Sequence, residues 1–175
     1  MRRSKAFVLA AAVAVAGTAA SAEVVVEGVH WQMGRVEGPR VVAWQDVKVL
    51  TDGPPKLDAR VRARLVLKNE GAKPEEGLLI RYSMTARVAP STGAEGVWAV
   101  PFVVEERRVP KVGANQMIEV PLETGAALEL YTRRVARAGW WPDRVKIQVM
   151  IEPRQGGVVL RTAEDALEIK SEPKK

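Results

Sequence analysis

Alternation of apolar and polar residues with a period of two is the feature that most constrains how this chain can fold. The segment 60–68 reads RVRARLVLK, so basic and apolar residues take turns along most of its length. Segments 78–88 and 144–152 alternate in the same way. Successive side chains of a β-strand point to opposite faces, so this pattern is typical of strands that bury one face. We therefore expect a chain dominated by half-buried β-strands.

Further strands are predicted at 24–32, 40–50, 97–108, 116–122, 158–161 and 166–170. Of these, 97–108 is apolar on both faces as far as Val104. Loops rich in Gly, Pro, Asn and Asp separate them. Pro101 interrupts the apolar segment 97–108 and has no backbone N–H to donate. An edge position or a bulge is therefore expected there.

One stretch departs from the period of two. In TGAALELYTRRVARAGWWPD, which begins at Thr124, apolar residues recur at helical spacing. Thr124 is a candidate N-cap, and Gly139 is a candidate stop with Pro142 just beyond it. The stretch predicts one short crossover helix at about 125–138.

Many short alternating strands and one crossover helix favour a mainly β fold, an antiparallel two-sheet sandwich. The strand–KNEG–strand layout around residues 68–71 resembles the immunoglobulin-like or fibronectin-type-III-like domains of bacterial envelope proteins. The resemblance covers roughly residues 60–170. It implies an immunoglobulin-like sandwich that serves as an interaction, adhesion or assembly module, and it implies no particular site residue. The chain lacks the paired cysteines of antibody domains.

The N-terminus has the order of a secretory signal peptide. It begins MRRSK, continues with an apolar stretch from 6 to 17, and reaches the small-x-small sequence ASA at 20–22. The apolar stretch is shorter than the roughly 20 residues that span a bilayer, so no transmembrane span is expected after cleavage. We expect residues 1–22 to be the signal peptide, 23–170 a single β-sandwich domain and 171–175 a flexible C-terminal tail.

Charge and cysteine content indicate where such a chain works. Cleavage removes Arg2, Arg3 and Lys5, so Lys+Arg falls from 27 to 24 against 21 Asp+Glu, and the formal net charge falls from +6 to +3. A charge of that size is ordinary, so we expect no nucleic-acid partner. The absence of Cys and of N-glycosylation acceptor sites favours a bacterial periplasm or cell surface over a eukaryotic secreted domain.

Residues for common catalytic chemistry are scarce. The chain has no Cys and a single His, His30, so thiol nucleophiles, thiolate metal sites and a zinc site of several His ligands are excluded. Adjacent carboxylates such as Glu75 and Glu76 should point to opposite faces of a strand. We therefore predict that the protein is not an enzyme and needs no metal or cofactor.

Two surfaces are candidates for ligand binding. The five Trp are many for this chain, and their rings can stack on sugars. Trp31, Trp44 and Trp98 are expected in the core, and the candidate stacking site consists of Trp140, Trp141, Tyr131 and Arg137. A candidate anion-docking face consists of Arg60, Arg62, Arg64, Arg81 and Arg87, provided that the strands 60–68 and 78–88 pair. The alternative is a solvated face on which these charges meet Glu residues of a neighbouring strand.

The leading hypothesis is an exported interaction or accessory domain of the bacterial envelope or extracellular space, which binds a protein partner or assembly. One alternative is a carbohydrate-binding module that uses exposed Trp. Another is a module that docks an anionic polymer on the Arg-rich face. The sequence names none of these partners.

Overall fold

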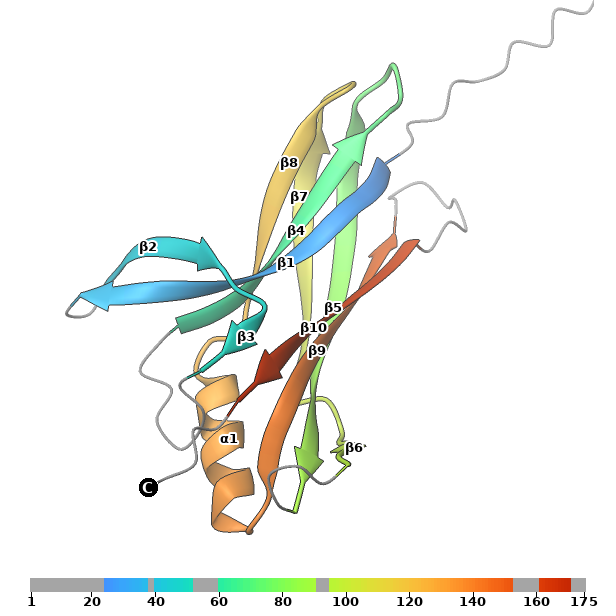
Figure 1. The fold of residues 1–175 in the computed structure, drawn as a ribbon. Coiled ribbons are helices and arrows are strands. Elements are labelled where there is room, and N and C mark those ends of the chain that lie inside the picture. Colours follow the sequence, from blue (N-terminus) through green and yellow to red (C-terminus); the bar gives the residue numbers. More distant parts are fainter. Residues whose placement is uncertain (1–23, 38–39, 52–59, 91–94, 153–160, 171–175) are drawn as a thin grey trace, which may run out of the picture.

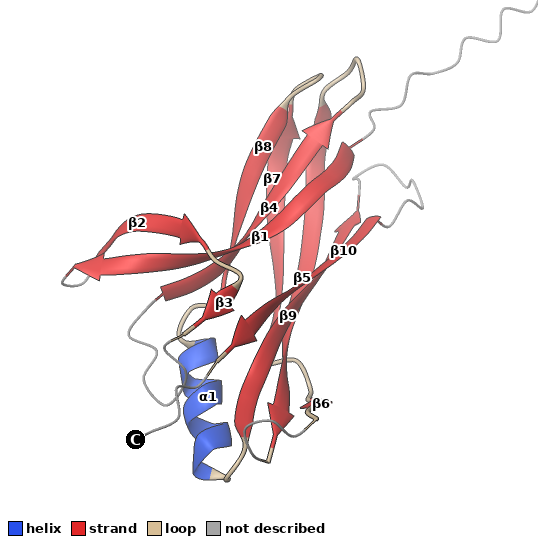
Figure 2. Cartoon of the chain, viewed as in Figure 1, coloured by secondary structure: helices blue, strands red, loops and turns tan. Residues whose placement is uncertain are grey.

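The computed structural model describes residues 24–37, 40–51, 60–90, 95–152 and 161–170. Its strands form two stacked sheets, and one helix lies at one end of them (Figures 1 and 2). The predicted two-sheet β-sandwich with a single short helix is confirmed. The elements are β1 (Val24–Glu37), β2 (Arg40–Asp46), β3 (Val49–Leu50), β4 (Arg60–Asn69), β5 (Glu75–Ala89), β6 (Val97–Trp98), β7 (Val103–Val112), β8 (Met117–Glu123), α1 (Ala127–Arg137), β9 (Trp141–Glu152) and β10 (Arg161–Ile169).

The four-stranded sheet has the order β2-β1-β4-β8, and all of its pairs are antiparallel. The six-stranded sheet has the order β3-β10-β9-β5-β6, and β7 also pairs with β5. Its pairs are antiparallel except for β3, which lies parallel to β10. The first and last described strands, β1 and β10, therefore lie in different sheets.

The core lies between the sheets and is built from the alternate apolar residues of the longest strands. In β4 the inward residues are Val61, Ala63, Leu65 and Leu67, which are all buried. The inward residues of β5 and β9 face them; they are Leu78, Ile80, Tyr82, Met84, Ala86, Val145, Ile147, Val149 and Ile151. The period of two in the sequence thus corresponds directly to the buried faces of the sandwich.

The turn between β4 and β5 carries the chain from one sheet to the other, so these two strands do not pair. We call this turn the arch. Asn69 fixes this arch from a fully buried position. Its Nδ2 donates to the carbonyls of Lys73 and Val112 at 2.8 and 3.2 Å, and its Oδ1 accepts from the N–H of Gly71 at 2.9 Å. The condition on which the anion-docking face depends, that the strands 60–68 and 78–88 pair, is therefore not met, because the arch separates them.

The helix α1 connects β8 of the four-stranded sheet to β9 of the six-stranded sheet, as the predicted crossover requires. Its N-cap is Ala126, which makes no side-chain capping bond. Thr124 is buried instead, and its hydroxyl donates to the carbonyl of Val61 at 2.6 Å. The helix ends as expected at Gly139, whose φ of 79° is in the left-handed region that glycine favours.

The edge of β5 carries β6 and β7 one after the other, with Pro101 between them. Trp98 pairs with Arg87, and Val103 pairs with Met84. Between these two pairs the edge advances five residues, whereas β5 advances only three. Both features predicted for Pro101, an edge position and a bulge, are present. A bulge of this kind twists an edge away from regular pairing.

Several expectations fall outside the described residues: the signal peptide at 1–22, most of the 51–58 turn, the 153–157 turn, the start of the strand 158–161 and the tail 171–175. Within the described part of the chain, no helix is long and apolar enough to cross a membrane.

We predict that Asn69→Ala lowers the free energy of unfolding by about 2 kcal/mol, because the buried carbonyl of Val112, the carbonyl of Lys73 and the N–H of Gly71 lose their partner. Asn115→Gly is the matched control, since Asn115 is exposed and has a φ of 53° that glycine adopts freely. Urea unfolding would measure both variants. Equal effects of the two substitutions would contradict the role of Asn69 in the arch.

Candidate docking groove

Two outer faces are available for binding, one on each sheet, and on both of them arginines form ion pairs with carboxylates of neighbouring strands. On the four-stranded sheet the register places His30 of β1 and Pro121 of β8 on either side of Arg64. Arg64 donates to Glu119 at 2.6 Å and to Asp46 at 2.9 Å. One guanidinium therefore joins carboxylates from both edge strands of this sheet.

Arg62 continues the same network. Its Nε donates to the side-chain carbonyl of Gln32 at 2.9 Å, and the Gln32 amide donates to Asp46 at 2.8 Å. Its guanidinium also lies 3.8 Å from the centre of the Trp44 ring and 3.7 Å from a carboxylate oxygen of Glu123. Because these arginines are held by carboxylates and an aromatic ring, this face has few cationic groups left for an anion.

The five arginines proposed for anion docking are not brought together. Arg60, Arg62 and Arg64 lie on β4, while Arg81 and Arg87 lie on β5 in the other sheet. Arg87 is bound by Asp143, whose carboxylate accepts bonds of 2.6 to 3.0 Å from its guanidinium. That contact raises the pKa of Arg87. The alternative expectation, arginines that meet carboxylates of neighbouring strands, describes this arrangement.

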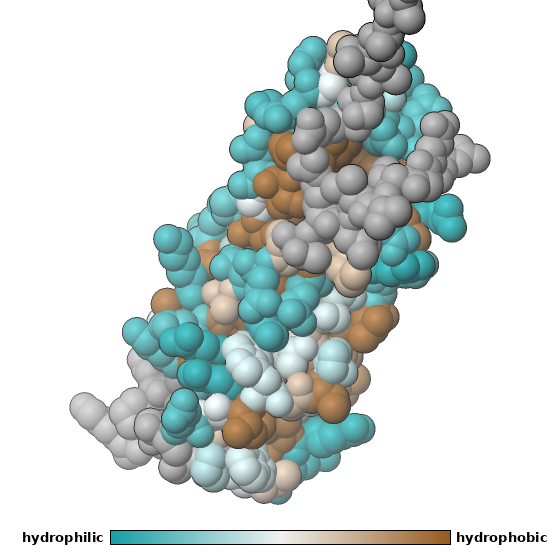
Figure 3. All heavy atoms as spheres, turned by 90° about the vertical axis from the view of Figure 1, so that its right-hand side faces the viewer, coloured by the Kyte–Doolittle hydropathy of each residue, from teal (hydrophilic) through white to brown (hydrophobic). Residues whose placement is uncertain are grey.

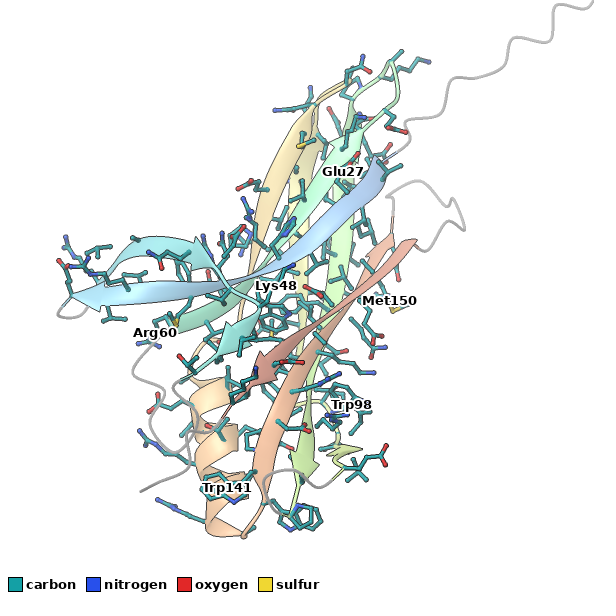
Figure 4. All side chains as sticks on the ribbon, in the orientation of Figure 1. Glu27, Lys48, Arg60, Trp98, Trp141 and Met150 are labelled. Carbon is teal, nitrogen blue, oxygen red and sulfur yellow. The ribbon has the colours of Figure 1, made fainter. Side chains whose placement is uncertain are left out.

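The four residues proposed for ligand stacking are also dispersed. Tyr131 is stacked on Phe102 with ring centroids 5.0 Å apart, so its ring contributes to packing. Burial raises the pKa of its phenol. Trp140 and Arg137 are exposed, and Trp141 is half-buried at the start of β9, beside the lower end of α1 (Figure 4). Of the Trp expected in the core only Trp31 is buried there.

The six-stranded sheet carries a groove of about 620 Å³ on its outer face. Its register brings Val104, Ser83, Gln148 and Glu164 into one row across β7, β5, β9 and β10. The next row contains Arg81 and Met150. These residues line the groove, and we call this surface the outer groove.

Exposed apolar side chains border the outer groove. Val104 is 75% exposed and Met150 is 38% exposed. Figure 3 shows hydrophobic side chains on this side of the molecule among hydrophilic ones, and Figure 4 places Met150 and Trp98 on that same side. Trp98 is itself exposed and lies under Lys146, whose Nζ is 4.7 Å from the ring centre. Exposed apolar residues with a polar rim are typical of interaction sites.

Ion pairs form the two ends of the outer groove. At one end Arg81 donates to Glu106 at 2.6 Å and also to Glu152. Hydrogen bonding to Glu106 and the charge of Glu152 raise the pKa of Arg81. At the other end the Gln148 amide donates to Glu164 at 3.0 Å, and Lys146 lies 3.7 Å from the same carboxylate. The carboxylates of Glu106, Glu152 and Glu164 on this rim are thus paired with Arg81 or Lys146, and exposed Arg108 lies in the same row as Glu152.

Tyr82 borders the outer groove from beneath. Its ring is buried in the sandwich, and its hydroxyl donates to Glu105 at 2.6 Å. Burial, and then the bond to Glu105, raises the pKa of Tyr82 far above its ordinary value. The phenol therefore lies on the core side of the sheet and does not face the groove.

Sequence reasoning missed the outer groove because its residues come from four strands that are far apart in the sequence. The alternation of 144–152 places Gln148 and Met150 on one face of a strand but does not show which strands lie beside it. A second hollow, of about 230 Å³, lies beside Trp44 and Arg60 at the edge of the four-stranded sheet. Among the described residues no group of three or more His, Cys, Asp or Glu could hold a metal ion.

Comparison with known proteins gives a likeness only to solved structures, since no family model and no curated protein matches the chain. It is similar to Pseudomonas fluorescens alkylpurine DNA glycosylase AlkC bound to DNA containing an abasic site analog. The identity is 17% and the TM-score 0.42, over 86% of this chain and 31% of the glycosylase chain. The chain thus spans about a third of the length of that enzyme.

Two further structures are similar to it. A protein from Archaeoglobus fulgidus shares 18% identity with a TM-score of 0.34, over 83% of this chain and 98% of that one. Spo0M, a sporulation control protein from Bacillus subtilis, shares 10% identity with a TM-score of 0.33, over 86% of this chain and 49% of that one. None of these descriptions names an immunoglobulin-like or fibronectin-type-III domain, so that resemblance stays a prediction.

The prediction that the chain is not an enzyme is corrected by the first of these comparisons. The glycosylase is an enzyme, and we withdraw the exclusion of catalysis. A shortage of Cys and His excludes particular nucleophiles and metal sites, but it does not exclude every reaction. At this identity and TM-score the likeness assigns no reaction to this chain.

We expect Arg64→Gln to lower the free energy of unfolding by about 1 kcal/mol, because Asp46 and Glu119 lose their shared partner. Arg60→Gln is the matched control on the same strand; Arg60 is exposed and should tolerate the change within about 0.5 kcal/mol. Denaturant unfolding at low and high salt would measure both. An unchanged stability of the Arg64 variant would contradict its role in joining the strands.

Both tyrosines of the chain should resist ionisation in the folded state. We expect little tyrosinate absorbance from the native chain at about pH 10, where tyrosines of the urea-unfolded chain are half ionised. Since the folded state raises the pKa of Tyr82, its contribution to stability is complete below about pH 10 and declines as pH rises further. Tyr82→Phe should reduce that decline. Coincident titration of native and unfolded chains would show that the phenols are accessible.

Proposed function

We propose that this chain is an exported interaction domain of a bacterial periplasm or cell surface, and that it binds a protein partner in the outer groove. The observation that carries the proposal is the outer groove itself. Val104 and Met150 are exposed beside it, and Ser83 and Gln148 supply a hydroxyl and an amide within it.

The chemistry of the groove supports a protein ligand. Its walls combine apolar side chains with an amide, a hydroxyl and fixed ion pairs, a mixture that suits a polypeptide segment with both apolar and polar side chains. The signal-peptide pattern of residues 1–22 supports export. The resemblance of residues 60–170 to envelope interaction domains supports the same role.

The glycan and anion alternatives gain less support. A sugar platform needs neighbouring exposed rings, whereas Tyr131 is stacked on Phe102. An anion-docking face needs uncommitted cations, whereas Arg62, Arg64, Arg81 and Arg87 all have carboxylate partners.

Selection of peptides from a random display library on the mature chain would test the outer groove. We expect Val104→Glu to weaken the selected peptides by about tenfold or more, because it buries a charge at the contact. Leu130→Glu is the matched control, since Leu130 is another exposed apolar residue, 61% accessible, and lies on α1 away from the groove lining. It should leave binding unchanged. Peptides that ignore Val104→Glu, or a library that yields no binders, would contradict the proposal.

A further inference from the structure

The outward side of α1 is basic. With 3.6 residues per turn, the exposed residues of the helix that lie opposite its buried side fall on one face; they are Leu130, Arg133, Arg134 and Arg137. The buried side, which carries Leu128 and Thr132, packs on the sandwich. We call Leu130, Arg133, Arg134 and Arg137 the basic stripe.

Trp140 extends the basic stripe just beyond the end of the helix. Its backbone N–H donates to the carbonyl of Val135 at 3.1 Å, and the N–H of Gly139 donates to the carbonyl of Ala136 at 3.1 Å. These two bonds, with the positive φ of Gly139, form a Schellman motif, which fixes the residue after the glycine. The backbone of Trp140 is therefore held in place, whereas its side chain is 40% exposed.

Two arginines of the basic stripe form no ion pair with another described residue. Glu129 pairs with Arg133, one turn away on the same helix. Ion pairs between described residues of the neighbouring strands join Arg87 to Asp143 and Arg144 to Glu168. Arg134 and Arg137 take part in none of these pairs. Glu95 precedes β6, which lies across β5 from β9, whereas α1 packs beside β9 (Figure 1).

The helix dipole explains only part of this arrangement. Arg134 and Arg137 lie in the last turn of α1, where cations offset the partial negative charge of the helix end. That effect does not account for the exposed apolar side chains among them, since Leu130 is 61% exposed and Trp140 follows directly. Cations mixed with Leu and Trp are typical of surfaces that meet a bilayer, where the cations approach lipid phosphates and indole rings lie at headgroup level.

An anionic lipid surface fits the basic stripe better than a soluble anionic partner does. The helix lies at one end of the sandwich with its outward side uncovered (Figure 2). Neither of the two hollows described above includes a residue of α1, so a peptide would find no walls there. A bilayer is broad and fluid and can meet a convex helix through a few side chains. The signal-peptide pattern of residues 1–22 also predicts a chain that works beside membranes and away from nucleic acid.

We propose that the basic stripe and Trp140 hold this chain against an anionic lipid surface, with Arg134 and Arg137 on lipid phosphates and the indole of Trp140 among the headgroups. Each arginine contributes about a fivefold gain in affinity near such a surface, so the contact is weak and reversible. It is independent of the proposed peptide binding, because no residue of the basic stripe lines the outer groove.

Co-sedimentation of the mature chain with lipid vesicles tests the proposal. Wild type should bind vesicles of equal parts phosphatidylglycerol and phosphatidylcholine about tenfold better than vesicles of phosphatidylcholine alone, and high salt should reduce the difference. Arg134→Gln combined with Arg137→Gln should weaken binding to the anionic vesicles by about tenfold or more. Trp140→Ala should weaken it by about fivefold, because the apolar area of the indole no longer leaves water.

Matched controls separate the basic stripe from the charge and exposed apolar area of the whole chain. Arg60→Gln combined with Arg108→Gln removes the same charge from two exposed arginines of β4 and β7. Met117→Ala removes an exposed apolar side chain at the far end of β8 from α1 (Figure 1). Both controls should bind anionic vesicles like wild type. Circular dichroism would confirm that every variant keeps its β structure.

Three results with vesicles would overturn the inference: no binding, equal binding to both kinds of vesicle, or binding that survives the combined change of Arg134 and Arg137. Heparin supplies a further test. If it bound as tightly as anionic vesicles, and Trp140→Ala changed neither affinity, the basic stripe would serve a soluble polyanion and the lipid inference would fail. Peptide selection on the outer groove tests the proposed function separately, so either proposal can fail while the other stands.

Discussion

Burial of alternate apolar side chains between two sheets is the constraint on which the rest of this molecule depends. Leu65 and Leu67 of β4 are fully buried, as are Ile80 and Met84 of β5. With no cysteine in the sequence, the described structure relies on this burial and on hydrogen bonding to hold the layers together. Once these residues point inward, the period of two places every second residue of the same strands on an outer face, where it must meet water, an ion-pair partner or another molecule.

The arch at Asn69 decides which outer face each strand contributes to. Because β4 and β5 enter different sheets, the outward arginines of β4 meet the carboxylates of β2 and β8. Those of β5 meet carboxylates of β7 and β9. A tight hairpin at the same place would have gathered like charges on neighbouring strands of one face, where they repel each other. The buried amide thus acts on stability and also on the distribution of surface charge.

Strand positions, the helix and the edge at Pro101 could be predicted because each rests on local periodicity or on the chemistry of one residue. The pairing of strands could not be predicted. The alternation of β4 is compatible with several neighbouring strands, and only the arch selects between them. The positions of Trp44 and Trp98 were also beyond local pattern. Each lies beside a cation from a strand distant in sequence, Arg62 for Trp44 and Lys146 for Trp98. The outer groove depends on the registers of four strands and has no local signature.

Protection of the sheet edges explains why association of this protein would proceed through side chains. An open edge invites pairing with another chain unless it is twisted or charged, or lacks donors. The bulge at Pro101 interrupts the edge formed by β6 and β7, and Glu105 and Arg107 place charges on the inward side of β7. Pro121 removes a donor from β8, the edge strand of the other sheet. With backbone pairing disfavoured at these edges, the exposed apolar side chains beside the outer groove offer a partner apolar area to bury.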